Sequence, residues 1–385
     1  MTALTCPHTE ALDRSQALLG HILSEIKANY GKISFARYME LALYAPGLGY
    51  YSNGSEKFGT KGDFITAPLL SPLFSHCIAR QCQAVLDPLE GGDILEIGAG
   101  NGQMAADILL ALEQVGSLPA HYFIVELSAE LQLRQRETIT SSCPQLLPHV
   151  QWLTSLPADF RGIILGNEVC DAMPVHRFQI TKTGIQEMEV IEKDGQLMQK
   201  FSATTNPQLI EFYESKNWPT IPYQSEINLH LKPWIQSLAD ILKAGLILLI
   251  DYGFGRSEYY HPDRSMGTFK CHYRHQHHSD ALLYPGLQDL TAHVDFTAIA
   301  ESGSDAGLDV LGYTHQAAFL ISCGLVDLAN ATQFKTEKER AIQNHAIQQL
   351  TSPQEMGELF KVIALGREIE EPLLGFELMD RRYTL

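Results

Sequence analysis

Apolar residues in the central part of this chain fall into two alternating patterns. Short apolar runs near 93–97, 121–126, 150–153, 162–167 and 246–251 predict β-strands, and stretches with helical spacing lie between several of them. Strands that alternate with helices in this way form a parallel sheet with helices packed on its faces. The pattern therefore predicts an α/β fold with a doubly wound, Rossmann-like core.

The part of the chain before this core has a helical pattern. Apolar residues at helical spacing over 15–30 predict one helix, and the pair Ser71 and Pro72 is typical of the start of another. A glycine- and aromatic-rich segment, 44–66, lies between them. We expect residues 1–88 to form a helical N-terminal extension whose loop covers a cofactor.

Two regions interrupt the core pattern. Residues 175–225 contain β-rich runs and hairpin-type turns, which predict a β-rich insertion subdomain. Residues 252–310 are rich in Gly, His and Tyr without clear periodicity, which predicts a long loop region of the functional kind. The core is then expected to comprise 89–174 and 226–385.

The first core strand runs into a glycine-rich turn, the most informative motif of the chain. Its acidic and glycine residues are Glu96, Gly98, Gly100 and Gly102. A strand, a glycine turn and a helix N-terminus form a nucleotide-type pocket at the carboxyl end of a parallel sheet. The dinucleotide fingerprint requires glycine where this chain has Gln103, so NAD is disfavoured. An acid two residues before G-x-G-x-G is instead the pattern of S-adenosylmethionine (SAM) methyltransferases, and an ordinary tight turn is the alternative.

The next predicted strand also ends on an acid, Glu126. In a doubly wound fold this position carries the acid that binds the ribose hydroxyls, whereas a solvated glutamate is the alternative. The order of strand, glycine turn, helix, strand and acid favours the ribose role. Earlier in the chain, Asp63 is a candidate for the SAM amino group and Thr66 for its carboxylate, although their spacing alone favours a simple turn.

Polar residues follow the strand predicted near 162–167. Asn167, Glu168 and Asp171 stand where the methyl donor lies in this fold. Methyl transfer is an in-line displacement, so the enzyme mainly positions the nucleophile and tunes its charge. A protonated guanidinium fits carboxylates in a forked geometry, so Glu168 and Asp171 would orient an acceptor nitrogen and help it to lose a proton. A capped turn with a surface ion pair explains them equally well. His293, in a strand-like stretch, either joins this acceptor site or caps a turn.

Length, charge and composition exclude several classes. The chain has 385 residues and a formal net charge of −17, which argues against nucleic acid as a partner. No apolar run is long enough to cross a bilayer, and no signal or transit peptide is visible, so we expect a cytoplasmic protein without membrane insertion. Seven cysteines without a C-x-x-C pair indicate free thiols in a reducing compartment. The histidines near 272–278 fit no standard zinc spacing, so we expect no metal.

Several segments of the chain together resemble the MidA-like methyltransferases, a family that includes the mitochondrial complex I assembly factor that methylates arginine. The similar segments are 33–39, 44–51, 62–68, 71–74, 95–102, 167–178, 251–253, 267–269, 273–275 and 288–296. The resemblance implies a SAM-dependent core and favours the roles of Asp63, Glu168 and Asp171. For the mitochondrial relatives it also implies symmetric dimethylation of an arginine on a complex I subunit. Cys170 and Met173 stand where family members often have leucine, and both are apolar exchanges.

The leading hypothesis is a SAM-dependent methyltransferase that acts on an arginine of a protein, by resemblance a respiratory complex I-type subunit. The long additions to the core favour a macromolecular acceptor over a small one. A small-molecule methyltransferase is the first alternative, a non-catalytic SAM-binding assembly chaperone the second, and an NAD-linked oxidoreductase the last. The acceptor, the number of methyl groups and the oligomeric state stay open, and a homodimer is one option.

Overall fold

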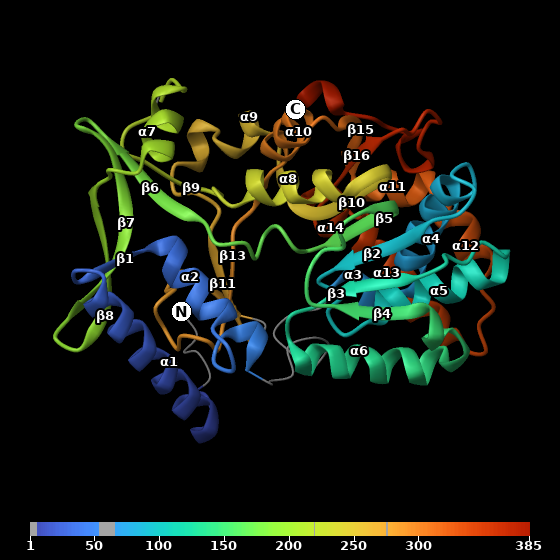
Figure 1. Ribbon diagram of the computed structural model, residues 1–385, viewed down its shortest axis with the longest axis horizontal. Coiled ribbons are helices and arrows are strands. Elements are labelled where there is room, and N and C mark those ends of the chain that lie inside the picture. Colours follow the sequence, from blue (N-terminus) through green and yellow to red (C-terminus); the bar gives the residue numbers. More distant parts are fainter. Residues whose placement is uncertain (1–5, 54–65, 219, 275) are drawn as a thin grey trace. The chain divides into compact units, whose positions relative to one another are not determined.

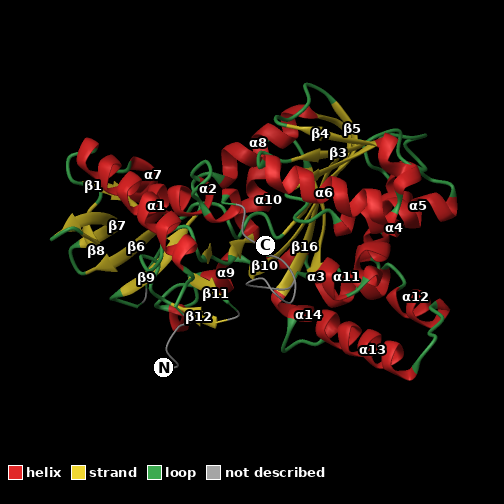
Figure 2. Cartoon of the chain, turned by 90° about the horizontal axis from the view of Figure 1, so that it is seen from below, coloured by secondary structure: helices red, strands yellow, loops and turns green. Residues whose placement is uncertain are grey.

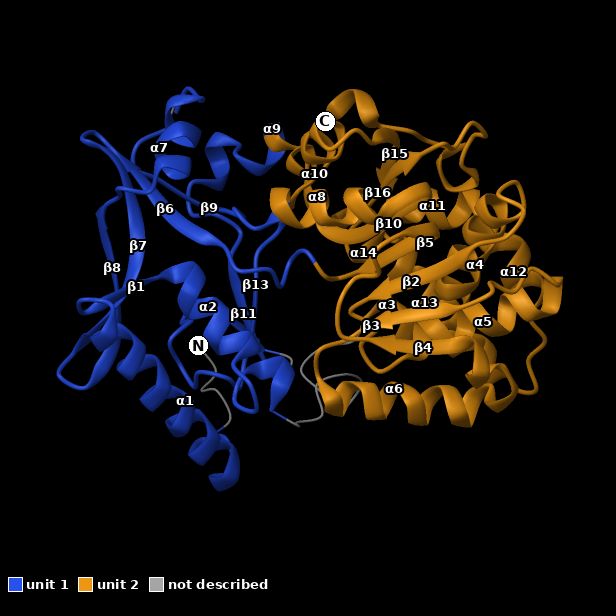
Figure 3. Ribbon diagram, viewed as in Figure 1, with its two compact units in different colours: residues 1–64, 170–231, 257–293 blue, residues 65–169, 232–256, 294–385 orange. Residues whose placement is uncertain are grey.

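The structure is a computed structural model that describes residues 6–53, 66–218, 220–274 and 276–385. Its contacts divide the chain into two compact units, each built from three segments (Figure 3). Unit 1 comprises Met1–Phe64, Cys170–Leu231 and Ser257–His293, and unit 2 comprises Ile65–Val169, Lys232–Arg256 and Val294–Leu385. The division into an extension, a core and an insertion made from the sequence stays a prediction.

Unit 2 is built on an eight-stranded mixed sheet (Figure 1). Its strands are β2 (Asp93–Ile97), β3 (Tyr122–Val125), β4 (Val150–Leu153), β5 (Phe160–Asn167), β10 (Leu242–Phe254), β14 (Val294–Asp295), β15 (Asp309–His315) and β16 (Phe360–Arg367). The order is β15-β16-β10-β5-β2-β3-β4, with β14 on β10. The strands from β10 to β4 are parallel, and β16 runs antiparallel to both β10 and β15.

The chain order reverses between β2 and β5. From β2 the chain continues through β3 to β4 on one side, and β5 then pairs with the other side of β2. Open α/β sheets bind their ligands outside the carboxyl ends of the strands at such a switch point. The glycine turn that follows β2 and the polar residues that follow β5 therefore lie at the expected ligand-binding edge.

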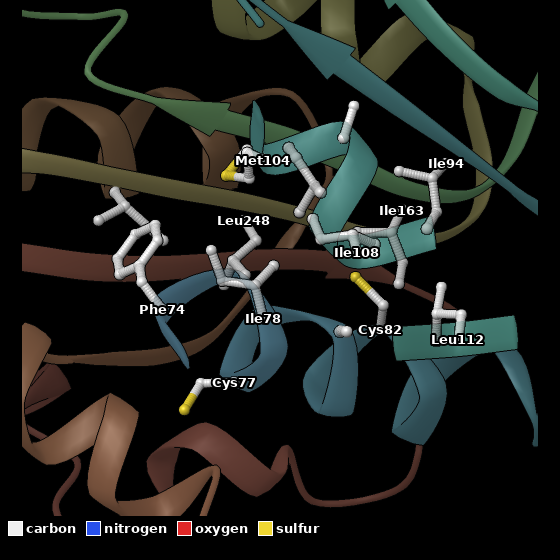
Figure 4. Close-up of a cluster of buried hydrophobic side chains, with 14 of the residues drawn as sticks. Phe74, Cys77, Ile78, Cys82, Ile94, Met104, Ile108, Leu112, Ile163 and Leu248 are labelled. Carbon is white, nitrogen blue, oxygen red and sulfur yellow. The ribbon is translucent and has the colours of Figure 1, made fainter. Parts of the chain in front are cut away.

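Helices cover both faces of this sheet. On one face, Ile94, Ile163 and Leu248 pack with Ile78 of α4 and Ile108 of α5 (Figure 4). On the other face, residues of the opposite parity are buried, namely Leu95, Ile164, Ile247, Leu249, Ile363 and Leu365, and α10 contacts β10 and β16 there. Because successive side chains of a strand point to opposite faces, this burial confirms the doubly wound α/β core.

The helices of unit 2 surround this core. They are α3 (Ala67–Leu70), α4 (Pro72–Leu86), α5 (Gln103–Val115), α6 (Ala129–Ser142), α8 (Leu231–Ile241), α10 (Phe296–Asp305), α11 (Gln316–Ser322), α12 (Leu325–Ala331), α13 (Glu337–Thr351) and α14 (Met356–Leu359). Helices α11 to α14 lie between β15 and β16 in the chain and form one group (Figure 2). The predicted start of α4 is confirmed, because the Ser71 hydroxyl accepts from the backbone N–H of Leu73 at 3.1 Å.

Unit 1 contains the helical extension and the extra antiparallel sheets. Its elements are α1 (Thr9–Ala28), β1 (Lys32–Ser34), α2 (Phe35–Tyr44), β6 (His176–Thr181), β7 (Gly184–Lys193), β8 (Gln196–Ala203), α7 (Pro207–Glu214), β9 (Tyr223–Ile227), β11 (Lys270–Tyr273), β12 (Gln276–His278) and β13 (Asp289–Thr291). Strands β1, β6, β7, β8 and β9 form one sheet, and β11, β12 and β13 form another. The predicted N-terminal helix and the predicted extra β-structure are confirmed, while the bounds of the extension and of the insertion stay predictions.

The stretch 252–310 differs from the long loop expected. It contains β11 to β14, the short helix α9 (Arg256–Tyr259) and α10. The strands there are two to four residues long, which is too short for a periodicity to show in the sequence.

Candidate active site

The glycine turn after β2 has a backbone that favours glycine. Gly98 and Gly102 have φ of 70° and 85°, in the left-handed region. A Cβ added to Gly98 would also lie 3.2 Å from Cγ2 of Val169. Gly102 is the N-cap of α5, a helix of 13 residues whose first amides point toward the turn. A turn without side chains at a helix N-terminus suits close approach of a polar ligand, so this feature of the chain fits SAM.

Glu96 lies in β2, one residue before the strand ends, and is 1% exposed. The Tyr122 hydroxyl donates to its Oε2 at 2.7 Å. Burial raises the pKa of this carboxyl to about 7, and the hydrogen bond from Tyr122 opposes that rise. Near neutral pH the group is thus present in both protonation states. Its role toward the cofactor stays a prediction.

Glu126 follows β3 directly, as the ribose role requires, and is buried. The Ser128 backbone N–H donates to its Oε1 at 2.8 Å, and the Gln135 side-chain amide donates to its Oε2 at 3.1 Å. These two donors fix the orientation of the carboxylate. The next residue, Leu127, is 79% exposed. An exposed apolar side chain next to a buried acid is a combination found at ligand sites. Sequence reasoning did not identify Leu127.

The end of β5 holds Asn167 and Glu168. Glu168 has φ of 52°, an uncommon conformation for a residue with a side chain, and its N–H donates to the Ile250 carbonyl at 2.9 Å. The Asn167 amide donates to Glu168 Oε1 at 3.1 Å. Within the described ranges, Asn167 Oδ1 is buried without a hydrogen-bond donor. Strained residues of this kind cluster at functional sites.

Asp251, three residues before the end of the neighbouring strand β10, supports this segment. It is buried, and its carboxylate accepts from the backbone N–H groups of Val169 at 3.2 Å and Tyr252 at 2.9 Å. It therefore anchors the chain that leaves Glu168 to the core of unit 2.

The two candidates for the methionine part of SAM lie before the core. Asp63 falls outside the described residues. Thr66 is the N-cap of α3, but its hydroxyl makes no capping hydrogen bond there. Helix α3 contacts α5, the helix that begins at the glycine turn. Thr66 is thus placed in the same unit as the turn, and its ligand role stays a prediction.

Asp171 and His293 lie in unit 1 and come close together through the backbone. Asp171 is 5% exposed, and its carbonyl accepts from the N–H of Ala292, the residue before His293, at 3.0 Å. The His293 N–H donates to the Thr268 hydroxyl at 3.1 Å. The boundary between the units falls between Val169 and Cys170, so Glu168 belongs to unit 2.

Aromatic side chains accompany Asp171 in unit 1, and sequence reasoning gave them no role. Tyr44 donates to the Ala172 carbonyl at 2.9 Å and stacks on Tyr51 with ring centroids 5.6 Å apart. Tyr51 donates to Asp289 Oδ1 at 2.9 Å. Burial and then the Asp289 carboxylate raise the pKa of Tyr51 well above its ordinary value, and Asp171 adds to this effect. The signal in the sequence was the aromatic 44–51 segment.

The described residues also bear on metal binding and on membrane insertion. Among the described residues, no three His, Cys, Asp or Glu side chains are grouped so that they could hold a metal ion. In the same part of the chain, no helix combines the length and apolar character needed to span a membrane.

The mixed sheet, its glycine turn and the acids at the ends of two strands define the class of SAM-dependent methyltransferases. The Methyltransf_28 profile, described as "Putative S-adenosyl-L-methionine-dependent methyltransferase", matches residues 77–314. The chain belongs to this family, its cofactor is SAM, and the resemblance to MidA-like methyltransferases is confirmed.

Known proteins similar to this chain agree with that assignment. A COG1565 superfamily member from Burkholderia thailandensis, solved with S-adenosyl-homocysteine bound, is 42% identical with a TM-score of 0.96 and full coverage of both chains. A second COG1565 structure from that organism is 41% identical with a TM-score of 0.93, again with full coverage of both. The protein arginine methyltransferase NDUFAF7, mitochondrial, of Danio rerio is 29% identical over 91% of this chain and 87% of its own length.

Proposed function

We propose that this protein transfers methyl groups from SAM to an arginine side chain of a protein. The observation that carries the proposal is Glu168, a carboxylate held in a strained backbone conformation at the carboxyl end of β5, beside the switch point. The arginine methyltransferase named among the similar proteins supports the choice of acceptor. From the resemblance to MidA-like methyltransferases described above, we propose a respiratory complex I-type subunit as the substrate.

The cofactor side of the proposal uses residues of unit 2. Bound SAM would supply an electrophilic methyl group on a sulfonium. Gly98, Gly100 and Gly102 leave room for its methionine part, and Glu126 binds the ribose hydroxyls. We propose that the exposed Leu127 covers the adenine ring. The remaining cofactor candidates from the sequence are Asp63, Thr66, Glu96 and Asn167, and we retain them as proposals.

The acceptor side uses Glu168, Asp171 and His293. A guanidinium nitrogen must lose a proton as it gains a methyl group, and it must point along the line of displacement. The two carboxylates hold the nitrogen by charge-assisted hydrogen bonds, and a carboxylate oxygen takes the released proton. His293, a candidate from the sequence, is retained as a further part of the proposal. The net charge of −17 suits a cationic, arginine-bearing partner and disfavours nucleic acid. We place this activity in the cytoplasm.

The decisive experiment compares Glu168→Gln with Glu90→Gln. Glu90 is an exposed glutamate with φ of 55°, so the control makes the same substitution in the same backbone conformation away from the site. With labelled SAM and a protein substrate, Glu168→Gln should lose roughly a hundredfold or more in methyl transfer, while SAM binding measured by calorimetry is retained. Full turnover in Glu168→Gln would remove the acceptor role.

The same assay separates the two alternative functions. SAM binding together with methylation of small acceptors only would favour a small-molecule methyltransferase. SAM binding without transfer to any acceptor would favour an assembly chaperone. Binding of NADH alone would contradict the assignment of SAM as the cofactor.

A further inference from the structure

The buried face of α6 carries a polar residue where its helical pattern requires an apolar one. The buried residues of this helix are Leu131, Gln135 and Ile139, spaced four apart on one face. Gln135 is completely buried. A glutamine side chain loses its hydrogen bonds to water at such a place, so it is tolerated only when the protein replaces them. Its partners therefore indicate what it does.

The Gln135 side chain makes three hydrogen bonds that connect the glycine turn to Glu126. Its Nε2 donates to the Gly100 carbonyl at 3.0 Å and to Glu126 Oε2 at 3.1 Å. Its Oε1 accepts from the Trp152 indole N–H at 2.9 Å. An indole N–H can only donate, and a carbonyl or carboxylate can only accept, so the orientation of the amide is unambiguous. One neutral side chain thus holds both the turn and the acid.

The backbone at Gln135 also lies close to the glycine turn. A Cβ added to Gly102 would lie 2.9 Å from the Gln135 Cα, a distance at which something must shift. Glycine at the third position of the turn therefore allows α6 to approach closely enough for Gln135 to reach Gly100. The turn and the helix are matched across this contact.

We infer that Gln135 is a positioning residue for SAM, acting through Glu126 and the glycine turn. The inference rests on the proposed cofactor role of Glu126. A carboxylate at position 135 would face the Glu126 carboxylate and the Gly100 carbonyl without a proton to donate. An apolar side chain would leave the Trp152 N–H and Glu126 without this partner, which costs free energy in a buried place. Only a neutral side chain that donates two hydrogen bonds and accepts one satisfies all three neighbours.

The test measures SAM affinity against pH for wild type, Gln135→Glu and Gln135→Met. At pH 8 both variants should bind SAM roughly tenfold or more weakly than wild type. As the pH falls toward 6, Gln135→Glu should regain part of its affinity relative to wild type, because a protonated carboxyl can donate one of the two hydrogen bonds that the amide made. Gln135→Met should not regain it. A further charged group near this contact is the Arg136 guanidinium, whose Cζ lies 4.1 Å from the centroid of the Trp152 ring.

Gln145→Glu is the matched control. Gln145 is exposed and donates to Glu113 Oε2 at 3.1 Å, so the control makes the same exchange beside a glutamate elsewhere in unit 2. It should bind SAM like wild type at every pH. Thermal unfolding of each variant shows whether it is folded.

The possible failures are distinct. Wild-type affinity in both Gln135 variants would overturn the inference alone. A loss in Gln135→Glu that low pH does not reverse would reduce Gln135 to a structural residue and also overturn it. A wild-type protein that binds no SAM would remove the proposed function, and the inference with it.

Discussion

Replacing Glu96 with glutamine should change how the stability of this protein depends on pH. Burial raises the pKa of the Glu96 carboxyl from its ordinary 4.5 to about 7. Between these two values the folded protein holds a proton that the unfolded chain has released. The contribution of Glu96 to stability is therefore fully present below pH 4.5 and is lost as the pH rises through 7. The glutamine variant has no such proton to lose.

The size of the effect follows from the displacement of the pKa. Each pKa unit corresponds to ~1.4 kcal/mol, so a rise from 4.5 to about 7 amounts to about 3 kcal/mol. The free energy of unfolding of Glu96→Gln, relative to wild type, should increase by about this amount between pH 4.5 and pH 8. Any constant cost of the buried amide cancels, because only the change with pH is compared. Asp107, whose pKa burial raises to about 6, titrates in both proteins and cancels as well.

The assay is urea unfolding of both proteins from pH 4.5 to 8 without SAM, since a ligand that binds the folded state would add its own stabilisation. Tyr122→Phe is a second variant with an opposite prediction. It removes the hydrogen bond that lowers the pKa of Glu96, so the loss of stability should extend to higher pH. A stability difference between Glu96→Gln and wild type that is flat across this range would refute the reasoning.

Two further variants test other features of the fold. Gly102→Ala should weaken SAM binding and stability, because its Cβ would meet Gln135, whereas Gly116→Ala, at the other end of α5 with φ of 74° and open space, should cost only about 1 kcal/mol in urea unfolding. Equal losses of stability in Gly102→Ala and Gly116→Ala would contradict this reasoning. Truncation after Met379 should cause concentration-dependent association in light scattering, because the N–H of Arg381 pairs with edge strand β15 and its removal leaves that edge open. A monodisperse truncated protein would contradict the capping role.

The central strands β2, β5 and β10 could be predicted from the sequence because consecutive residues along them are buried, so both faces of the sheet are covered there. Strands β2, β4 and β5 begin and end within two residues of the apolar runs. By contrast, β15 and β16 were not identified, although β16 contains four consecutive apolar residues, Val362 to Leu365. A short apolar run does not distinguish a buried strand from a buried helix. The two antiparallel partners of β16, β10 and β15, are also far away in the sequence.

Some residues of the candidate site could likewise be predicted from the sequence, and others could not. The glycine turn and Glu126 could be found because each belongs to one local motif, namely a strand and the residues that follow it. Gln135 could not, because its three partners lie 35, 9 and 17 residues away in the sequence. Only tertiary packing joins them, and nothing in the spacing of one sequence indicates such a network.

A buried glutamine alone does not mark a site. Gln81 accepts from the Gly375 N–H at 2.8 Å and Gln316 donates to the Leu350 carbonyl at 2.9 Å, and both are completely buried. The partners described for these two are backbone groups at connections between helices and loops, which is a structural task. Gln135 differs because one of its partners is the Glu126 carboxylate at a strand end of the switch-point sheet. The identity of the partner, rather than the burial of the polar group, therefore separates a residue that positions a ligand from one that closes a loop.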